Sequence, residues 1–177
     1  MKKLCITLVS LAIILLAGLG VSINSNQVKT EYLRIHIRAN SNSDDDQAVK
    51  YKIKTAVIEY LTPFISECNT KQKAKQVFLE QELNVEKVAN KVLLESGFNY
   101  QSKVQIREEY FPTRVYDGIT LDAGVYDAVI IELGNAQGQN WWCVVYPPLC
   151  FVNVGTKYEY KSKILEIVND FIKREGQ

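Results

Sequence analysis

The stretch Tyr32-Leu-Arg-Ile-His-Ile-Arg-Ala-Asn40 alternates apolar and polar side chains along its whole length. Successive side chains of a β-strand point to opposite faces, so this period of two predicts a strand with one apolar face. The polar face would carry Arg34, His36, Arg38 and Asn40. The Asn and Ser residues at positions 40–43 hydrogen-bond their own backbone and favour a turn after the strand. The apolar face of such a strand must be covered by a second layer of structure.

The middle of the chain has helical spacing. Ser43 with Asp46 three residues later fits a capping box, and apolar residues recur at helical intervals up to Phe64, where Pro63 is expected to kink or end the helix. Residues 70–82 are densely charged and predict a second, more exposed helix. A third helix is predicted over residues 85–93, with Asn84 as its cap and Gly97 as its stop.

The second half of the chain predicts strands and a closing helix. Residues 103–110 alternate, and residues 125–133 are apolar on both faces, which is typical of a central strand. A glycine-containing loop, 134–140, then leads to residues 141–146, interpreted as the returning strand of a hairpin. Residues 157–174 form an amphipathic pattern that predicts a last helix. The expected fold is α+β with two layers, a mostly antiparallel sheet packed with several helices.

The N-terminus is expected to direct export. Lys2 and Lys3 precede an apolar run from Leu4 to Val21, so residues 1–25 are interpreted as a signal peptide or an N-terminal membrane anchor. Residues 26–177 would then form a single exported domain. Without the two lysines the chain has 19 basic and 20 acidic residues, and this balance gives no reason to expect nucleic acid as a partner.

Three stretches carry a resemblance to a known family: Gly134 to Phe151 with its Asn-Trp-Trp-Cys and Pro-Pro-Leu-Cys motifs, Phe111-Pro-Thr-Arg-Val-Tyr116, and Leu33 to Ser41. From about residue 31 to the C-terminus, the chain resembles the stage II sporulation protein R family of endospore-forming bacteria. It departs from that pattern with Asp122 in place of proline, Arg38 in place of an apolar residue and Asn42 in place of aspartate.

The resemblance implies a signalling function. Family members are exported into the space between forespore and mother cell, where they activate a membrane-bound aspartic protease. That protease removes the pro-sequence of sigma factor E. On this resemblance the chain is expected to be a ligand and not an enzyme, to need no cofactor, and to meet the membrane only through its N-terminal segment.

Two cysteines outside the cytoplasm offer a disulfide. Cys143 and Cys150 flank a Pro-Pro turn, and a bond between them would restrict the unfolded chain by about 2–3 kcal/mol in the loop-entropy model. The alternative is two buried thiols, because bridging fails when the Cα atoms lie more than about 7 Å apart. Cys68 is expected to be unpaired.

The only histidine raises one enzymatic alternative. His36, Cys143 and Asn40 could form the Cys-His-Asn triad of a secreted hydrolase acting on cell wall or peptide, if the fold brought them together. A structural or interface histidine is the competing interpretation, and a plain structural domain of the cell envelope is a third. No metal site is expected, because the chain has one histidine and no Cys-x-x-Cys motif.

Aromatic, proline and arginine residues suggest a surface for a partner protein, since such residues anchor interfaces. The hypothesis joins two turns and one strand residue into one patch: Phe111, Pro112, Arg114, Trp142, Pro147, Pro148 and Leu149. The competing interpretation is that both segments only make turns around a buried aromatic cluster.

Overall fold

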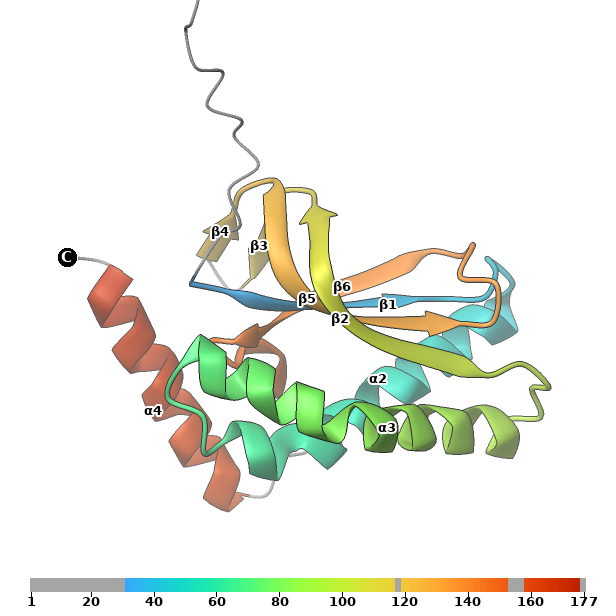
Figure 1. Cartoon of the computed structure of the whole chain (residues 1–177), viewed down its shortest axis with the longest axis horizontal. Helices are drawn as coiled ribbons and strands as arrows, with labels where there is room; N and C mark the ends of the chain where they lie inside the picture. Colours follow the sequence, from blue (N-terminus) through green and yellow to red (C-terminus); the bar gives the residue numbers. More distant parts are fainter. Residues whose placement is uncertain (1–30, 117–118, 153–157, 176–177) are drawn as a thin grey trace, which may run out of the picture.

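Strand β1 (Leu33–Arg38) lies inside a four-stranded sheet of order β2-β5-β1-β6 (Figure 1). The other strands are β2 (Ser102–Phe111), β5 (Gly124–Leu133) and β6 (Asn140–Tyr146). This computed structural model describes residues 31–116, 119–152 and 158–175, so the expected signal segment lies outside the described residues. The predicted strand around residues 32–40 and the central position of the strand at 125–133 are both confirmed.

The predicted hairpin between residues 125–133 and 141–146 is wrong. β6 pairs antiparallel with β1, and β1 in turn pairs parallel with β5, so β1 separates the two expected hairpin partners. The loop between β5 and β6 crosses the end of β1, where the Gly138 amide donates to the Ala39 carbonyl. Because the inserted strand comes from the far N-terminal part of the domain, no local pattern could indicate it. With β2 antiparallel to β5, the sheet is mixed and mostly antiparallel, as expected.

Helix α2 (Asp44–Ile65) begins as the capping box predicts. The Ser43 side chain accepts a hydrogen bond from the Asp46 amide. Pro63 lies within the last turn of this helix, and the helix ends two residues beyond it. The short η1 (Leu149–Phe151) follows β6 after Pro147 and Pro148. Helix α4 (Tyr158–Glu175) confirms the predicted closing helix.

The two helices predicted over residues 70–93 are one helix, α3 (Lys71–Glu95). Its cap is Thr70, whose hydroxyl accepts from the Lys73 amide, and Asn84 is an ordinary surface residue within it. The helix continues because no proline or glycine interrupts it and one buried stripe runs through both halves: Ala74, Phe78, Val85, Ala89 and Leu93. Gly97 ends the helix as predicted, with a φ of 82° that favours glycine.

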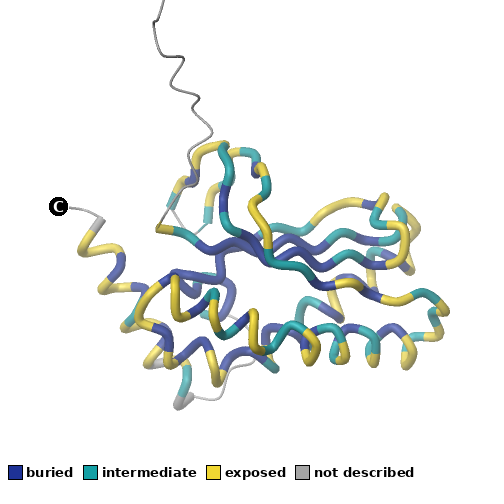
Figure 2. Tube along the Cα trace, in the orientation of Figure 1, coloured by how far each residue is buried: buried dark blue, intermediate teal, exposed yellow. Residues whose placement is uncertain are grey.

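The helices form a second layer on one face of the sheet. Figure 1 shows α2 and α3 along one side of the strands, and Figure 2 shows the buried positions gathered between these layers. The core there contains Leu33, Ile35 and Ile37 of β1, which pack with buried residues of α2 and α3. α4 adds Ile164 and Phe171 to this core. The apolar face of β1 is thus covered by helices, as its alternation requires.

The opposite face of the sheet is partly covered by a small hairpin. Strands β3 (Arg114–Tyr116) and β4 (Ile119–Leu121) pair antiparallel and lie on the side of the sheet away from the helices (Figure 1). The sequence did not predict this hairpin as a separate sheet. It places Arg114 and Tyr116 above the polar residues of β1, which form the candidate site.

Candidate functional site

We call the sheet surface that faces away from the helices the outer face. Strand register places His36 of β1 beside Trp142 of β6 and Ile130 of β5 on this face. Residues two positions along each strand share the same side, so Arg34 and Arg38 flank His36 there. A small apolar cluster also lies on the outer face, made of Phe111, Tyr126, Ala128 and Ile130.

Arg34 is buried in a cage of aromatic rings. Its side chain has no exposed surface, and its guanidinium carbon lies 4.2 Å from the ring centre of Phe111 and 4.8 Å from that of Tyr126. Nη2 donates a hydrogen bond of 2.6 Å to the hydroxyl of Tyr116, which joins β1 to the hairpin. Among the described residues, Nε and Nη1 have no hydrogen-bond partner. Burial lowers the pKa of Arg34, but a guanidinium does not lose its charge in a protein, so the cage holds a cation.

His36 is fixed between a carboxylate and a tryptophan. Its Nδ1 lies 2.7 Å from Oε1 of Glu109, and its ring stacks on Trp142 with centroids 5.2 Å apart. Burial lowers the pKa of His36, although the hydrogen bond to Glu109 acts in the opposite direction. The imidazole is therefore neutral at neutral pH, and Nδ1 carries the proton that it donates to the carboxylate.

Glu109 also joins a network of arginines on the outer face. Arg38 donates to Glu109 at 2.6 Å and to Glu132 at 2.9 Å, and Arg107 contacts the same two carboxylates. Burial acts to raise the pKa of Glu109. The hydrogen bonds from His36 and Arg107 and the nearby charge of Arg38 outweigh that effect, so the pKa is lower than usual. Glu109 therefore remains an anion that orients His36 and neutralises its arginine neighbours.

The structure does not assemble the Cys-His-Asn triad. Cys143 lies opposite Ile35 in the register of β6 and β1, so it faces the helices while His36 faces the other way. Cys143 is bonded to Cys150, with Cα atoms 6.0 Å apart. Asn40 is held in the turn after β1, where its amide donates to Asp46. Cys68 is free and buried. The one histidine and its candidate nucleophile thus belong to opposite faces of the sheet.

The residues expected to bind a partner do not form one patch. Arg114 and Trp142 come together on the outer face, with the guanidinium carbon 4.2 Å from the tryptophan ring centre. Phe111 is fully buried under Arg34, and Pro112 follows it at the start of the hairpin. The segment Pro147–Leu149 lies instead next to the helices: both prolines are buried, Leu149 is half-buried, and η1 contacts α2 and α4.

The two neighbouring tryptophans separate as strand geometry requires. Trp142 is on the outer face, while Trp141 packs against the main core and has Lys54 near its ring. Both are partly buried. Sequence reasoning missed Glu109 and Tyr116, which hold His36 and Arg34. Their contacts span 73 and 82 residues, so only the polar alternation of β1 gave any sign that such partners were needed.

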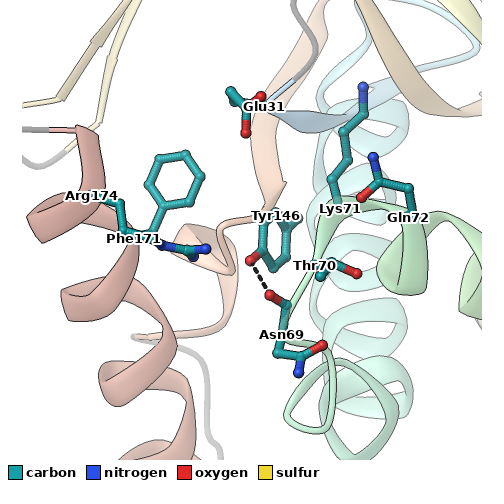
Figure 3. A pocket seen from close by; sticks show the side chains of 8 residues that line it. All are labelled: Glu31, Asn69, Thr70, Lys71, Gln72, Tyr146, Phe171 and Arg174. Atoms are coloured by element: carbon teal, nitrogen blue, oxygen red, sulfur yellow. Dashed lines mark hydrogen bonds between the residues drawn. The ribbon is translucent and has the colours of Figure 1, made fainter.

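Apart from the outer face, a hollow lies between α4 and the start of α3 (Figure 3). Tyr146, Phe171 and Arg174 line one side, and the Tyr146 hydroxyl donates to the Asn69 carbonyl within it. Lys71 also borders the hollow, but its amine pairs with Asp127 beneath α3. The Tyr146 hydroxyl and the Lys71 amine are therefore both occupied by neighbouring groups of the fold.

Two features are absent from the described part of the chain. None of the helices placed between residues 31 and 175 is long and apolar enough to cross a membrane. Within the same described ranges, no three His, Cys, Asp or Glu side chains gather where they could hold a metal ion.

Comparison with known proteins identifies the family. The model of the family described as stage II sporulation protein R matches residues 29–156. The chain belongs to the stage II sporulation protein R family. It is 32% identical over 126 residues to the protein "Stage II sporulation protein R" of Bacillus subtilis (strain 168). That match covers 71% of this chain and 56% of the relative, so the chain corresponds to little more than half of the relative's length. No solved structure matches it.

The family match contains the whole candidate site. Residues 29–156 include the four strands of the sheet, the β3–β4 hairpin and the Cys143–Cys150 disulfide. Helix α4 lies beyond the matched residues. The outer face of this stage II sporulation protein R family member is therefore part of the region that matches the family.

Proposed function

We propose that this chain is an exported signalling protein that activates a membrane-bound aspartic protease, which in turn processes the precursor of sigma factor E. In this proposal the chain carries a signal from forespore to mother cell and has no catalytic site of its own. Family membership supports the sporulation role, and the resemblance described above supplies the finer steps.

One observation carries the choice of a ligand over an enzyme. The only histidine of the chain is held by Glu109 and Trp142 on the outer face, while Cys143 faces the helices in a disulfide. A cysteine hydrolase needs a free thiolate next to a base, and Cys143 meets neither condition. What the outer face offers instead is an arginine stacked on a tryptophan, the pair of residue types most often found as interface anchors.

The disulfide supports a location outside the cytoplasm. Disulfides persist in oxidising compartments and are rare where thiols are kept reduced. The apolar segment ahead of the domain would carry residues 26–177 across the forespore membrane and either be removed or remain as an anchor. The domain would then meet the protease in the space between the two cells.

A co-expression experiment tests the proposal. The full chain, the protease and the sigma-E precursor are produced together in a host that does not sporulate, and precursor cleavage is followed by immunoblot. Cleavage is expected only when all three proteins are present, and a protease with its catalytic aspartates replaced is the control.

Two results would contradict the proposal. The first is cleavage of the precursor by the protease at the same rate without this chain. The second is cleavage by this chain in the presence of the inactive protease, which would show that the chain is itself the enzyme.

A further inference from the structure

We propose that Arg114, whose guanidinium lies over the ring of Trp142, is the docking site for a carboxylate side chain of the partner polypeptide. This inference rests on the proposed function, because it specifies the chemistry by which the ligand recognises its protease. The inference names the guanidinium of Arg114 as the contact group and a carboxylate of the protease as the group that it binds.

The arginine is prepared for binding by a stack of three side chains. The guanidinium carbon of Arg114 lies 4.2 Å from the centre of the Trp142 ring. The ring of His36 also stacks on Trp142, with an interplanar angle of 30°. Glu109 fixes His36 by a hydrogen bond. Each group limits the motion of the next, so little side-chain entropy is left to lose when an anion binds the guanidinium.

Arg114 differs from its arginine neighbours in having no carboxylate. Arg38 and Arg107 each contact both Glu109 and Glu132. Among the residues that the structure describes, no carboxylate pairs with Arg114, and its Nε is buried without a hydrogen-bond partner. Structures seldom leave a buried donor unpaired, so this Nε is available to an acceptor that the described residues do not supply.

A second cation under the same hairpin strengthens the demand for an anion. Arg34 is fully buried and donates to Tyr116, and two of its nitrogens have no hydrogen-bond partner within the described part of the chain. Tyr116 and Arg114 share one side of β3, so the hairpin sets two guanidinium groups close together with no described carboxylate between them. A partner carboxylate on Arg114 would offset the charge of both.

The charge of the surrounding surface favours the same partner. Among the described residues of the four-stranded sheet, the outer face carries four cations, Arg34, Arg38, Lys103 and Arg107, against two carboxylates, Glu109 and Glu132. Arginine binds carboxylates with two parallel hydrogen bonds, and charge complementarity speeds the encounter and fixes the register of a complex.

A polypeptide carboxylate fits this site better than lipid phosphate. Binding to an anionic membrane surface needs a cluster of accessible cations. Here Arg38 and Arg107 are neutralised by Glu109 and Glu132, and Arg34 is enclosed. The exposed Lys103 lies at the end of β2 away from the hairpin. What remains beside the hairpin is the guanidinium of Arg114 next to the exposed Val115, which suits a single acidic side chain beside an apolar one.

The test reverses the charge of the arginine in the full chain. Arg114→Glu and the charge-keeping Arg114→Lys are each co-expressed with the protease and the sigma-E precursor. Arg174→Glu, the same reversal at an exposed position on α4, is the matched control. Two readouts are taken: the fraction of precursor cleaved, and the amount of protease that co-purifies with the tagged chain from detergent-solubilised membranes.

We expect Arg114→Glu to lower co-purification and cleavage by about thirtyfold or more, the effect of losing a typical interface anchor. Arg114→Lys should fall between it and the wild type, and Arg174→Glu should match the wild type. Acidic residues in the exported loops of the protease are then changed to arginine one at a time. One of these changes should restore cleavage with Arg114→Glu.

The outcomes separate the two proposals. If the wild-type chain neither co-purifies with the protease nor promotes cleavage, the proposed function fails, and the docking site fails with it. If the wild type does both and Arg114→Glu does so equally well, only the docking site is overturned. It is also overturned if no charge reversal in the protease rescues Arg114→Glu, or if the wild type binds protein-free phosphatidylglycerol vesicles through Arg114.

Discussion

The disulfide between Cys143 and Cys150 should contribute a measurable part of the stability of the domain. The two cysteines are separated by seven positions, and in the loop-entropy model a closed loop of about eight residues is worth about 2–3 kcal/mol. Both lie in the main core, so replacement by alanine avoids burying a hydroxyl. For a domain of roughly 150 residues, this loss corresponds to a fall in Tm of about 5–10 °C.

The assay is guanidinium unfolding of residues 26–177, followed by circular dichroism with and without dithiothreitol. Cys143→Ala with Cys150→Ala should lower the free energy of unfolding, and reduction of the wild type should lower it by a similar amount. Cys68→Ala removes a buried free thiol and is the control for lost packing. The double variant should still activate the protease at temperatures where it is folded.

Two results would refute this reasoning. If dithiothreitol leaves wild-type stability unchanged, the bond does not stabilise the domain. The second result concerns Cys143→Ala alone: a folded domain as stable as the Cys68→Ala control that binds the protease but gives no cleavage. The sulfur would then take part in the chemistry, and the ligand interpretation would fail.

Three further predictions concern the outer face and the turns beside it. Arg34→Met should change the free energy of unfolding by less than about 1 kcal/mol, because the cation that it removes has no described carboxylate partner. Arg34→Ala should cost about 2–4 kcal/mol because it leaves a cavity among the aromatic rings, and equal losses for the two variants would contradict this prediction. Burial depresses the pKa of His36 in the folded state, so its contribution to stability is fully present above about pH 6.5 and should be lost as the pH falls below that value. His36→Phe should flatten the acid side of the stability curve, and an unchanged slope would argue against this prediction. Gly138→Ala should destabilise the domain by about 2 kcal/mol or more, because the new methyl group would collide with the Ser41 carbonyl. Gly97→Ala should cost about 1 kcal/mol in the same unfolding assay, because Gly97 has a left-handed conformation but open space around it.

Helix α3 shows where local patterns reach their limit. The charge density of residues 70–82 and the presence of Asn84 suggested a break between two helices, yet the helix runs through both. Capping residues are tolerated inside helices when a continuous buried stripe is stabilised by packing, and here the stripe packs against the sheet. Ser43 was read correctly because its hydrogen bond to the Asp46 amide lies within four residues of chain.

The partner surface shows the same limit. Sequence reasoning named Arg114 and Trp142, and the fold brings these two together. It also named Pro147, Pro148 and Leu149, which the fold places beside the helices instead. Which of several aromatic turns share a surface depends on strand order, and strand order is set by contacts between residues far apart in the chain.

The sequence by itself determined the periodic elements, the α+β class, the capped start of α2 and the family. These depend on local spacing and on motifs that survive without knowledge of the fold. Only the tertiary structure decided that β1 lies between β5 and β6 and that His36 and Cys143 face opposite ways. It also decided that Arg38 and Arg107 pair with carboxylates, whereas no described carboxylate pairs with Arg114. Composition gives a nearly neutral chain, but strand register sorts its charges between two faces. The physical reason is that the pleat fixes only the alternation of side chains, while the burial of the whole sheet against α2 and α3 fixes which strands meet.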